Sequence, residues 1–271
     1  MLEGKKVAVL GVGTMGRALG LGLLRSGKIG AGSLAGTVRH PERAARASEA
    51  LGIEVGTDNV AAARGADVLL VCTKPHVTLG VLAELAEAGV LESDPLVISI
   101  AAGLNLVRLQ EACGGDTPLV RAMPNTPCLI GEGMTVLSAG QHTDDEHLRA
   151  VEGIFEPLGR VLRIDEEHMN TVTGLSASGP AFVYVIIESL AEGGVMMGLP
   201  RRTATELAAQ AVQGAARMVL ETGRHPAELK DEVTTPAGCT ISALLALEDG
   251  RLRSVLARGV EAAARAAAEL G

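Results

Sequence analysis

From Lys5 to about Ile164 the chain alternates short β-rich runs with helical stretches, and this alternation is the feature that most constrains its fold. It is typical of a doubly wound sheet of parallel strands that carries helices on both faces. After Asp165 the β-rich runs stop, and the remaining sequence has a helical pattern punctuated by glycine and proline. We therefore predict an α/β domain over residues 1–165 and an all-α domain over residues 166–271.

The runs predicted to be strands are short and rich in aliphatic residues. They are Val7–Leu10, Ser33–Val38, Ile53–Val55, Asp67–Cys72, Leu96–Ile100, Leu119–Ala122, Thr135–Ser138 and Val161–Ile164. Although 47% of the residues are hydrophobic, the chain has only two Phe, one Tyr and no Trp. We therefore expect a core built from aliphatic side chains and Met.

Composition argues against several classes of partner. The formal net charge of -8 and the scarcity of aromatic side chains argue against a nucleic-acid partner, which requires clustered cations and stacking rings. The four cysteines are far apart and no signal-peptide pattern is seen, so we expect a soluble, cytoplasmic protein without a metal site. The uncharged stretch Gly174–Ile187 is too short to span a bilayer, so we expect no membrane partner.

A glycine-rich sequence, Gly11-Val12-Gly13-Thr14-Met15-Gly16, follows the first predicted strand and opens an apolar helix that runs through Leu24. In this context the first glycine permits a tight turn, the second admits a pyrophosphate, and the third lets helix and strand pack closely. The start of the helix adds partial positive charge. We predict a Rossmann dinucleotide site that includes Thr14 and Met15, and the alternative is a glycine-rich turn without a ligand.

The second predicted strand ends in Thr37-Val38-Arg39-His40, where an NAD enzyme would place Asp or Glu against the ribose hydroxyls. Arg39 would instead attract a 2'-phosphate, with His40 beside it. This predicts NADPH as the cofactor, with NADH possible, and the alternative reading of Arg39 is a solvated loop arginine.

Two further loops follow predicted strands at the edge where open α/β sheets bind ligands. The loop Thr73-Lys74-Pro75 follows the predicted strand Asp67–Cys72, and the loop Ala101-Ala102-Gly103 follows the predicted strand Leu96–Ile100. We predict that the backbone of both loops contacts the cofactor. Lys74 and His76 could each donate a proton, although such side chains are more often solvated.

The helical domain has two segments crowded with small residues. The first is Gly174–Phe182, in which Pro180 suits the first position of a long apolar helix. The second is Thr234–Thr240. It follows a short predicted helix, Pro226–Val233, and leads into another helix that starts near Thr240. The free N-H groups of that helix would bind a carboxylate, whereas the hydroxyls of Thr235 and Thr240 could simply cap it.

Taken together, the motifs resemble the Δ1-pyrroline-5-carboxylate reductase family in order and spacing over essentially the whole chain. The segments that carry the resemblance are the glycine motif, Lys74-Pro75, Met123-Pro124-Asn125-Thr126-Pro127, Gly174–Phe182, Gly198-Leu199-Pro200-Arg201 and Pro236–Thr240. The chain departs from the family's usual Pro-Gly-Gly by having Ala237 in the last segment. If that position has a positive φ, Ala237 carries a steric cost of about 1 kcal/mol or more.

The resemblance implies a hydride transfer from NAD(P)H to the C=N carbon of pyrroline-5-carboxylate, giving L-proline in the last step of proline biosynthesis. By the same resemblance, Thr235, Gly238, Cys239 and Thr240 would hold the substrate carboxylate, and Asn59 would contact the adenine-side ribose. We predict that Thr240 orients the ring for catalysis.

Thr173 could face the nicotinamide, or it could be a hydroxyl at a helix start. His168 and His225 lie outside the motif positions, so no histidine of the helical domain is expected to act as acid or base.

The apolar run Ala181–Ile187 and the pair Met196 and Met197 give more apolar surface than a lone helical hairpin can bury. Members of the family that this chain resembles form interlocked dimers, which build rings. The resemblance therefore implies a homodimer that builds a larger homo-oligomer.

Two alternatives remain open. One is a reductase of the 3-hydroxy acid dehydrogenase type, which relies on a lysine in the helical domain, where this chain has only Lys230 beside Asp231 and Glu232. The other is a non-catalytic NADPH sensor, which would explain the first domain but not the second.

Overall fold

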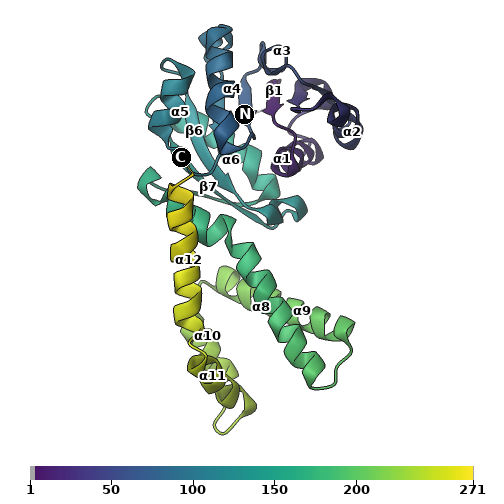
Figure 1. Cartoon of the computed structure of the whole chain (residues 1–271), viewed down its shortest axis with the longest axis vertical. Helices are drawn as coiled ribbons and strands as arrows, with labels where there is room; N and C mark the ends of the chain where they lie inside the picture. Colours follow the sequence, from purple (N-terminus) through teal and green to yellow (C-terminus); the bar gives the residue numbers. More distant parts are fainter. Residues whose placement is uncertain (1–3, 271) are drawn as a thin grey trace. The chain divides into compact units, whose positions relative to one another are not determined.

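The computed structural model describes residues 4–270, which form two compact units (Figure 1). The first unit comprises the chain up to Ser178 together with the segment from Ala262 onward, and the second is Gly179–Glu261. The first unit contains an eight-stranded sheet in the order β3-β2-β1-β4-β5-β6-β7-β8. The strands are β1 (Val7–Leu10), β2 (Leu34–Thr37), β3 (Glu54–Gly56), β4 (Val68–Val71), β5 (Leu96–Ser99), β6 (Leu119–Pro124), β7 (Gly133–Ala139) and β8 (Gly159–Arg163).

Every run predicted to be a strand forms one, and the predicted α/β fold with a Rossmann domain is confirmed. The sheet is not wholly parallel, because β7 runs antiparallel to β6. The connection between these two strands is a short 3-10 turn, Thr126–Ile130. A link of this length cannot carry the chain back across the sheet, as a parallel crossover requires. The predicted parallel sheet is therefore corrected to a mixed sheet at this one pair.

Helices cover both faces of the sheet, which explains the nearly continuous apolar strands. In β1 the residues alternate between two cores: Val7 and Val9 belong to one, and Ala8 and Leu10 to the other. The first core is closed by α1 (Thr14–Arg25), α2 (Pro41–Leu51) and α6 (Asp145–Phe155). The second core is closed by α3 (Asn59–Ala63), α4 (Pro75–Glu87) and α5 (Leu106–Cys113).

The second unit is entirely helical, as predicted. Its helices are α8 (Gly179–Met196), α9 (Arg201–Thr222), α10 (Pro226–Val233), α11 (Cys239–Asp249) and α12 (Leu252–Ala268), the last of which ends in the first unit. The α8–α9 hairpin is held by small side chains, since Ala191, Ala204 and Ala208 form its buried cluster. Much of α8 stays uncovered within one chain: Tyr184 is 61% exposed and Met196 is 81% exposed.

A helical run precedes α8 and is continuous with it. It consists of a 3-10 turn (Glu166–His168), α7 (Met169–Val172) and a π-helical segment (Thr173–Ala177). The whole run, Glu166–Met196, is long and apolar enough to cross a membrane by length and composition alone. The uncharged stretch Gly174–Ile187 lies inside this run, which extends beyond it at both ends. Exposed apolar helices of this kind also form subunit interfaces, so the length of the run does not decide its role.

A buried arginine ties the start of this run to the sheet. Arg121 of β6 is only 2% exposed, and its Nη1 lies 3.3 Å from Oε1 of Glu166. Its Nη2 donates to Oδ1 of Asn170 at 3.2 Å, and its Nε has no partner among the described residues. Burial lowers the pKa of the Arg121 guanidinium, and the Glu166 carboxylate opposes that shift. Residues 166–170 are thus fastened to the sheet by charge-assisted hydrogen bonds.

We predict that Arg121→Met destabilises the protein by about 2–3 kcal/mol. A fully buried ion pair loses about 3–5 kcal/mol when one partner is removed, and Glu166 can recover part of that loss because it is partly hydrated. Arg163→Met is the matched control, since Arg163 binds Glu152 at the surface with 38% of its side chain exposed, and should lose at most about 1 kcal/mol. Urea unfolding at a fixed protein concentration measures both, and equal losses would contradict the prediction.

Candidate active site

The carboxyl ends of four parallel strands meet at one edge of the sheet. The register pairs Leu10 of β1 with Thr37 of β2 and with Val71 of β4, and Val71 in turn with Ser99 of β5. The loops that follow these strands therefore start side by side. The strand order also reverses between β1 and β4, because β2 and β3 lie on one side and β5 and β6 on the other. Such a switch point is where open α/β sheets bind their ligands.

The three glycines of the predicted dinucleotide motif have three different reasons to be glycine. Gly11 has a φ of 99°, and a Cβ there would lie 3.0 Å from the carbonyl carbon of Cys72. A Cβ on Gly16 would lie 2.3 Å from the carbonyl oxygen of Gly11, so α1 reaches β1 only without a side chain here. A Cβ on Gly13 would meet nothing within 4 Å. Open space at Gly13 is what a pyrophosphate that approaches the backbone needs.

Helix α1 starts behind this loop with its first turn uncapped. Its N-cap residue, Gly13, has no side chain, and the first turn contains no acidic residue. The N-H groups of Gly11 and Val12 already donate to the carbonyl of Thr37, at 3.2 Å and 2.7 Å. Those of Thr14 and Met15 lie in the first helical turn, whose donors have no intrahelical acceptor. The site is therefore electropositive and suited to an anion.

Thr37 is a site residue that the sequence interpretation missed. It is 2% exposed, and its hydroxyl accepts the Gly11 N-H at 3.2 Å and donates to Oδ1 of Asn59 at 2.8 Å. The Asn59 amide in turn donates to Oε2 of Glu84 at 3.3 Å. Thr37 thus places Asn59 beside the glycine loop. A polar residue that ends an otherwise apolar strand next to the motif was the signal available in the sequence.

Arg39 and His40 follow β2 and are both exposed. Arg39 makes no side-chain hydrogen bond or ion pair within the part of the chain that the structure describes, so its guanidinium faces solvent beside the site. His40 is the N-cap residue of α2, and its Nδ1 lies 3.8 Å from Oε1 of Glu42. Both positions fit a phosphate site next to the glycine loop.

The loops after β4 and β5 complete this edge. The Thr73 hydroxyl lies 2.8 Å from that of Thr78, while Lys74 is the exposed N-cap residue of α4 and Pro75 is its first residue. Burial raises the pKa of the neighbouring Cys72 thiol to about 12, so this thiol stays protonated and is no nucleophile. His76 is exposed, and its role as a proton donor stays a prediction.

The loop after β5 contains Gly103, which has a φ of 81°. Ala101 is buried, and Ala102 packs with Met123, Met169 and Ala177 in a small cluster that also involves the helical run. Thr173 is 7% exposed, and its hydroxyl donates to the Met169 carbonyl at 2.9 Å. It lies inside a continuous helical run, so the alternative of a hydroxyl at a helix start is wrong.

The second unit presents another uncapped helix start, between α10 and α11. Helix α11 begins at Cys239 with Gly238 as its N-cap residue, no side-chain cap and no acidic residue in its first turn. The Gly238 N-H donates to the Thr235 carbonyl at 3.0 Å, and a Cβ on Gly238 would lie 2.4 Å from Oγ1 of Thr235. Neither threonine caps this helix, which removes the alternative reading of Thr235 and Thr240. Thr240 is half-buried, whereas Cys239 is exposed.

Ala237 has a φ of 55°, so this position has the positive φ that carries a steric cost for alanine. An L-residue in the left-handed region is strained by about 1–2 kcal/mol, and glycine is not. The loop keeps this conformation despite the missing glycine. The hydrogen bond from the Gly238 N-H to the Thr235 carbonyl closes a turn that contains Ala237.

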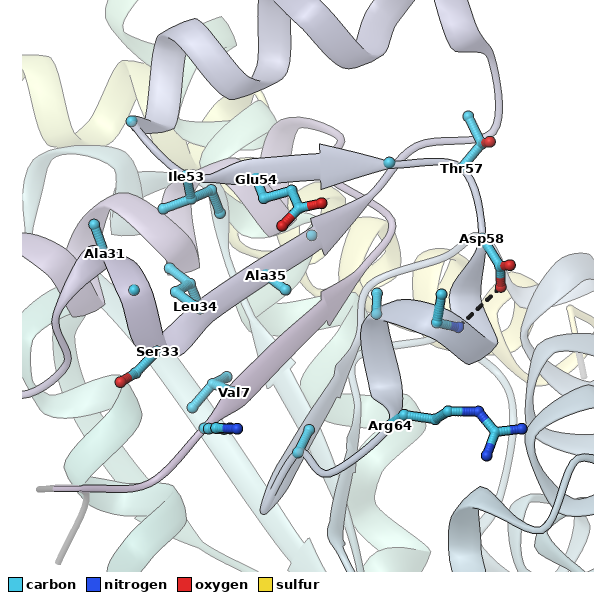
Figure 2. A pocket seen from close by; sticks show the side chains of 18 residues that line it. Val7, Ala31, Ser33, Leu34, Ala35, Ile53, Glu54, Thr57, Asp58 and Arg64 are labelled. Atoms are coloured by element: carbon cyan, nitrogen blue, oxygen red, sulfur yellow. Dashed lines mark hydrogen bonds between the residues drawn. The ribbon is translucent and has the colours of Figure 1, made fainter.

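A groove of about 800 Å³ lies elsewhere in the first unit (Figure 2). Its lining comes from β2 and β3, from the 3-10 turn Ala31–Ser33 and from the residues in and around α3. Glu54 comes from β3, Ala35 from β2, and Asp58 and Arg64 from either end of α3. None of the predicted site residues lines it.

A Rossmann sheet with this glycine loop at its switch point, followed by a helical unit, defines a two-domain oxidoreductase of the nicotinamide-dinucleotide class. Residues 6–103 match the family model "NADP oxidoreductase coenzyme F420-dependent", and residues 166–270 match "Pyrroline-5-carboxylate reductase dimerisation". The chain belongs to the pyrroline-5-carboxylate reductase family.

Individual relatives agree with this membership. The reductase of Methanosarcina acetivorans is 38% identical over 100% of this chain and 99% of its own length. That of Synechocystis is 45% identical over 81% of this chain and 80% of its own. The pyrroline carboxylate reductase of Plasmodium falciparum, solved with NADP bound, superposes with a TM-score of 0.90 at 31% identity over 100% of both chains. That of Coxiella burnetii also has a TM-score of 0.90, at 34% identity over 98% of both.

The glycine loop yields a paired stability prediction. Gly16→Ala should destabilise the protein by about 2 kcal/mol or more, because an overpacked backbone contact forces helix and strand apart. Gly13→Ala should change stability by about 1 kcal/mol at most, since open space surrounds it and only the N-cap preference is lost. Thermal and urea unfolding compare the two variants, and a reversed order would refute the roles assigned to these glycines.

Proposed function

We propose that the chain reduces 1-pyrroline-5-carboxylate to L-proline with NADPH. The observation that carries the proposal is that each unit presents a glycine-bounded helix start with no side-chain cap and no acid in its first turn. The start of α1 suits a pyrophosphate and that of α11 suits a carboxylate, because both places offer free N-H donors and partial positive charge. Family membership over the full chain adds the substrate class.

The cofactor is held by backbone groups and by a few side chains. The pyrophosphate lies on the loop Gly11–Gly16, where the N-H groups of Thr14 and Met15 face it. Arg39 and His40 bind the 2'-phosphate, and Asn59, held by Thr37, contacts the adenine-side ribose. The loops Thr73-Lys74-Pro75 and Ala101-Ala102-Gly103 line the rest of the cofactor site. The bound cofactor supplies the hydride.

The substrate carboxylate is held at the start of α11 by Thr235, Gly238, Cys239 and Thr240, largely through N-H groups. A cyclic imine protonated at nitrogen is already an electrophile, so the hydride adds to the imine carbon and the ring nitrogen keeps its proton. The protein then has to position the ring and exclude water rather than supply a strong acid. We assign the orientation of the ring to Thr240 and a place beside the nicotinamide to Thr173.

The surroundings of the titratable side chains agree with this chemistry. Nδ1 of His225 accepts the Ala227 N-H at 3.2 Å as the cap of α10, and Nε2 of His168 lies 3.5 Å from Oε1 of Glu167. Lys230, the sole lysine after residue 165, lies 2.7 Å from the Asp231 carboxylate. A lysine so engaged argues against the 3-hydroxy acid dehydrogenase alternative. A solved 3-hydroxyisobutyrate dehydrogenase shares only the fold, at 16% identity and a TM-score of 0.50.

The dimerisation domain indicates that the chain assembles with a second copy of itself. The exposed apolar residues of α8 and its end, among them Tyr184, Leu190 and Met196, are the surface that such a partner would cover. We propose a homodimer that builds a larger homo-oligomer, in a cytoplasm that keeps all four free cysteines reduced. In functional terms, residues 1–165 form the dinucleotide domain and residues 166–271 the substrate and dimerisation domain.

We predict that Arg39→Asp reverses or abolishes the preference for NADPH over NADH, because a carboxylate repels the 2'-phosphate and accepts the ribose hydroxyls of NADH. The expected change in the ratio of the two kcat/KM values is about 100-fold or more, equivalent to a lost charge-assisted pair of about 3 kcal/mol. Arg46→Asp, on the exposed face of α2, makes the same charge change and should leave the ratio unaltered. An unchanged ratio in the Arg39 variant would refute the assignment.

The reaction itself is tested by following NADPH oxidation with pyrroline-5-carboxylate, beside a 3-hydroxy acid with NADP+. Activity on the imine alone supports the proposal, and activity on the hydroxy acid alone would replace it with the closest alternative.

Thr240→Ala should lower kcat/KM for the imine by about 100-fold, the loss expected from a misplaced ring. Thr205→Ala is the matched control, because its hydroxyl donates within α9 to the Arg201 carbonyl at 3.0 Å. Wild-type kcat/KM in the Thr240 variant would show that its hydroxyl has no part in the reaction.

A further inference from the structure

Asn125, in the Met-Pro-Asn-Thr-Pro motif, has no place in the function described so far. It follows β6 directly and is half-buried. Its Oδ1 accepts the Met134 N-H at 2.9 Å, and its Nδ2 donates to the carbonyl of Ser176 at 3.2 Å. The two bonds use opposite sides of the same amide. One holds the side chain to β7, and the other reaches the π-helical segment Thr173–Ala177.

The Ser176 carbonyl needs a donor from outside the helix because of Pro180. In an α-helix the carbonyl of residue 176 accepts the N-H of residue 180, and proline has no N-H. The proline ring also crowds the carbonyl four residues earlier, which is again that of Ser176. The amide of Asn125 therefore supplies the hydrogen bond that the sequence of the helix itself removes.

The π-helical turn is the second feature of the structure that accommodates Pro180. The Ser178 N-H donates to the carbonyl of Thr173 at 3.0 Å, one residue later than in an α-helix. A turn that holds one extra residue gives the proline ring room and tips the Ser176 carbonyl outward, towards Asn125. Pro180 is the second residue of α8, within one residue of the helix position that the sequence predicted, and the helical run from Glu166 continues through it.

The π-helical segment also packs against the edge of the sheet that holds the cofactor loops. Ala177, from the segment, and Ala102, from the loop after β5, pack against the same small cluster around Met123 and Met169. Thr173 lies at the other end of the segment. A shift of the segment would therefore move Thr173 and disturb Ala102 together.

We propose that Asn125 is a positioning residue for hydride transfer, which holds the π-helical segment by replacing the N-H that Pro180 lacks. The inference rests on the proposed function, because it gives Thr173 and Ala102 their place beside the nicotinamide. Misplacement of reacting groups by a fraction of an ångström lowers turnover without weakening binding of the remote parts of the cofactor. The effect should thus fall on kcat and not on the affinity for NADPH.

The test compares the wild type with Asn125→Asp, which keeps the acceptor for Met134 and removes the donor to Ser176. We expect kcat for the imine to fall by about tenfold or more, with the dissociation constant of NADPH unchanged. Asn105→Asp is the matched control: its Oδ1 caps α5 by accepting the Arg108 N-H at 2.9 Å, and a carboxylate preserves that bond. This control should keep wild-type kcat.

A double-mutant cycle with Pro180→Ala distinguishes a positioning role of Asn125 from a purely structural one. It measures the effect of Asn125→Asp on kcat with and without the proline. With an N-H restored at residue 180, the Ser176 carbonyl has a donor within the helix, so adding Asn125→Asp should lower kcat by less than about threefold in that background. Equal losses in both backgrounds would show that Asn125 does not act through Ser176 and would overturn the proposal.

The remaining outcomes are also decisive. Wild-type kcat in Asn125→Asp overturns the inference. If Asn125→Asp no longer binds NADPH, Asn125→Ser, which adds no charge, is tested instead. Loss of NADPH binding in both variants would assign Asn125 a role in folding and would overturn the inference. A wild-type enzyme that binds NADPH but does not turn over the imine refutes the proposed function instead, which separates the two failures.

Discussion

The close approach of α1 to β1 at Gly16 is the contact on which the cofactor site depends. Because a Cβ on Gly16 would lie 2.3 Å from the carbonyl oxygen of Gly11, the helix can start directly behind the strand only with glycine at that position. This contact directs the first turn of α1 at the switch point of the sheet. It leaves Gly13 with open space in front of it. The electropositive helix start is useful to a ligand only because this packing exposes it.

Strand β6 plays a comparable part for the residues that follow the sheet. Arg121 of this strand binds Glu166 and Asn170, and Asn125, which follows the strand directly, binds Ser176. Residues 166–178 therefore group with the sheet although their sequence is helical, and the second compact unit begins only at Gly179. The change of pattern in the sequence and the division of contacts in the structure mark different features, one of secondary structure and the other of packing.

Several site features were readable because they depend on local sequence. The glycine loop and the short helix Pro226–Val233 each follow from backbone preferences within a few residues. The positive φ at residue 237 was considered only because the family that the chain resembles has glycine there, since alanine by itself disfavours that conformation. The π-helical segment, the hydrogen bond from Thr37 to Asn59 and the bond from Asn125 to Ser176 did not follow. The two hydrogen bonds join residues far apart in the chain. The π-helical segment depends on how Pro180 is accommodated by a neighbouring residue, and no local pattern identifies that residue.

The sequence by itself determined the class of fold, the cofactor motif and the family, because periodicity and short motifs encode local geometry. Only the tertiary structure decided that β7 runs antiparallel to β6, that Arg121 is buried against Glu166, and that the helical run passes through Pro180. Strand direction, burial of a charge and repair of a missing hydrogen bond are set by partners across space. A linear pattern carries no information on which distant group will be within about 3 Å.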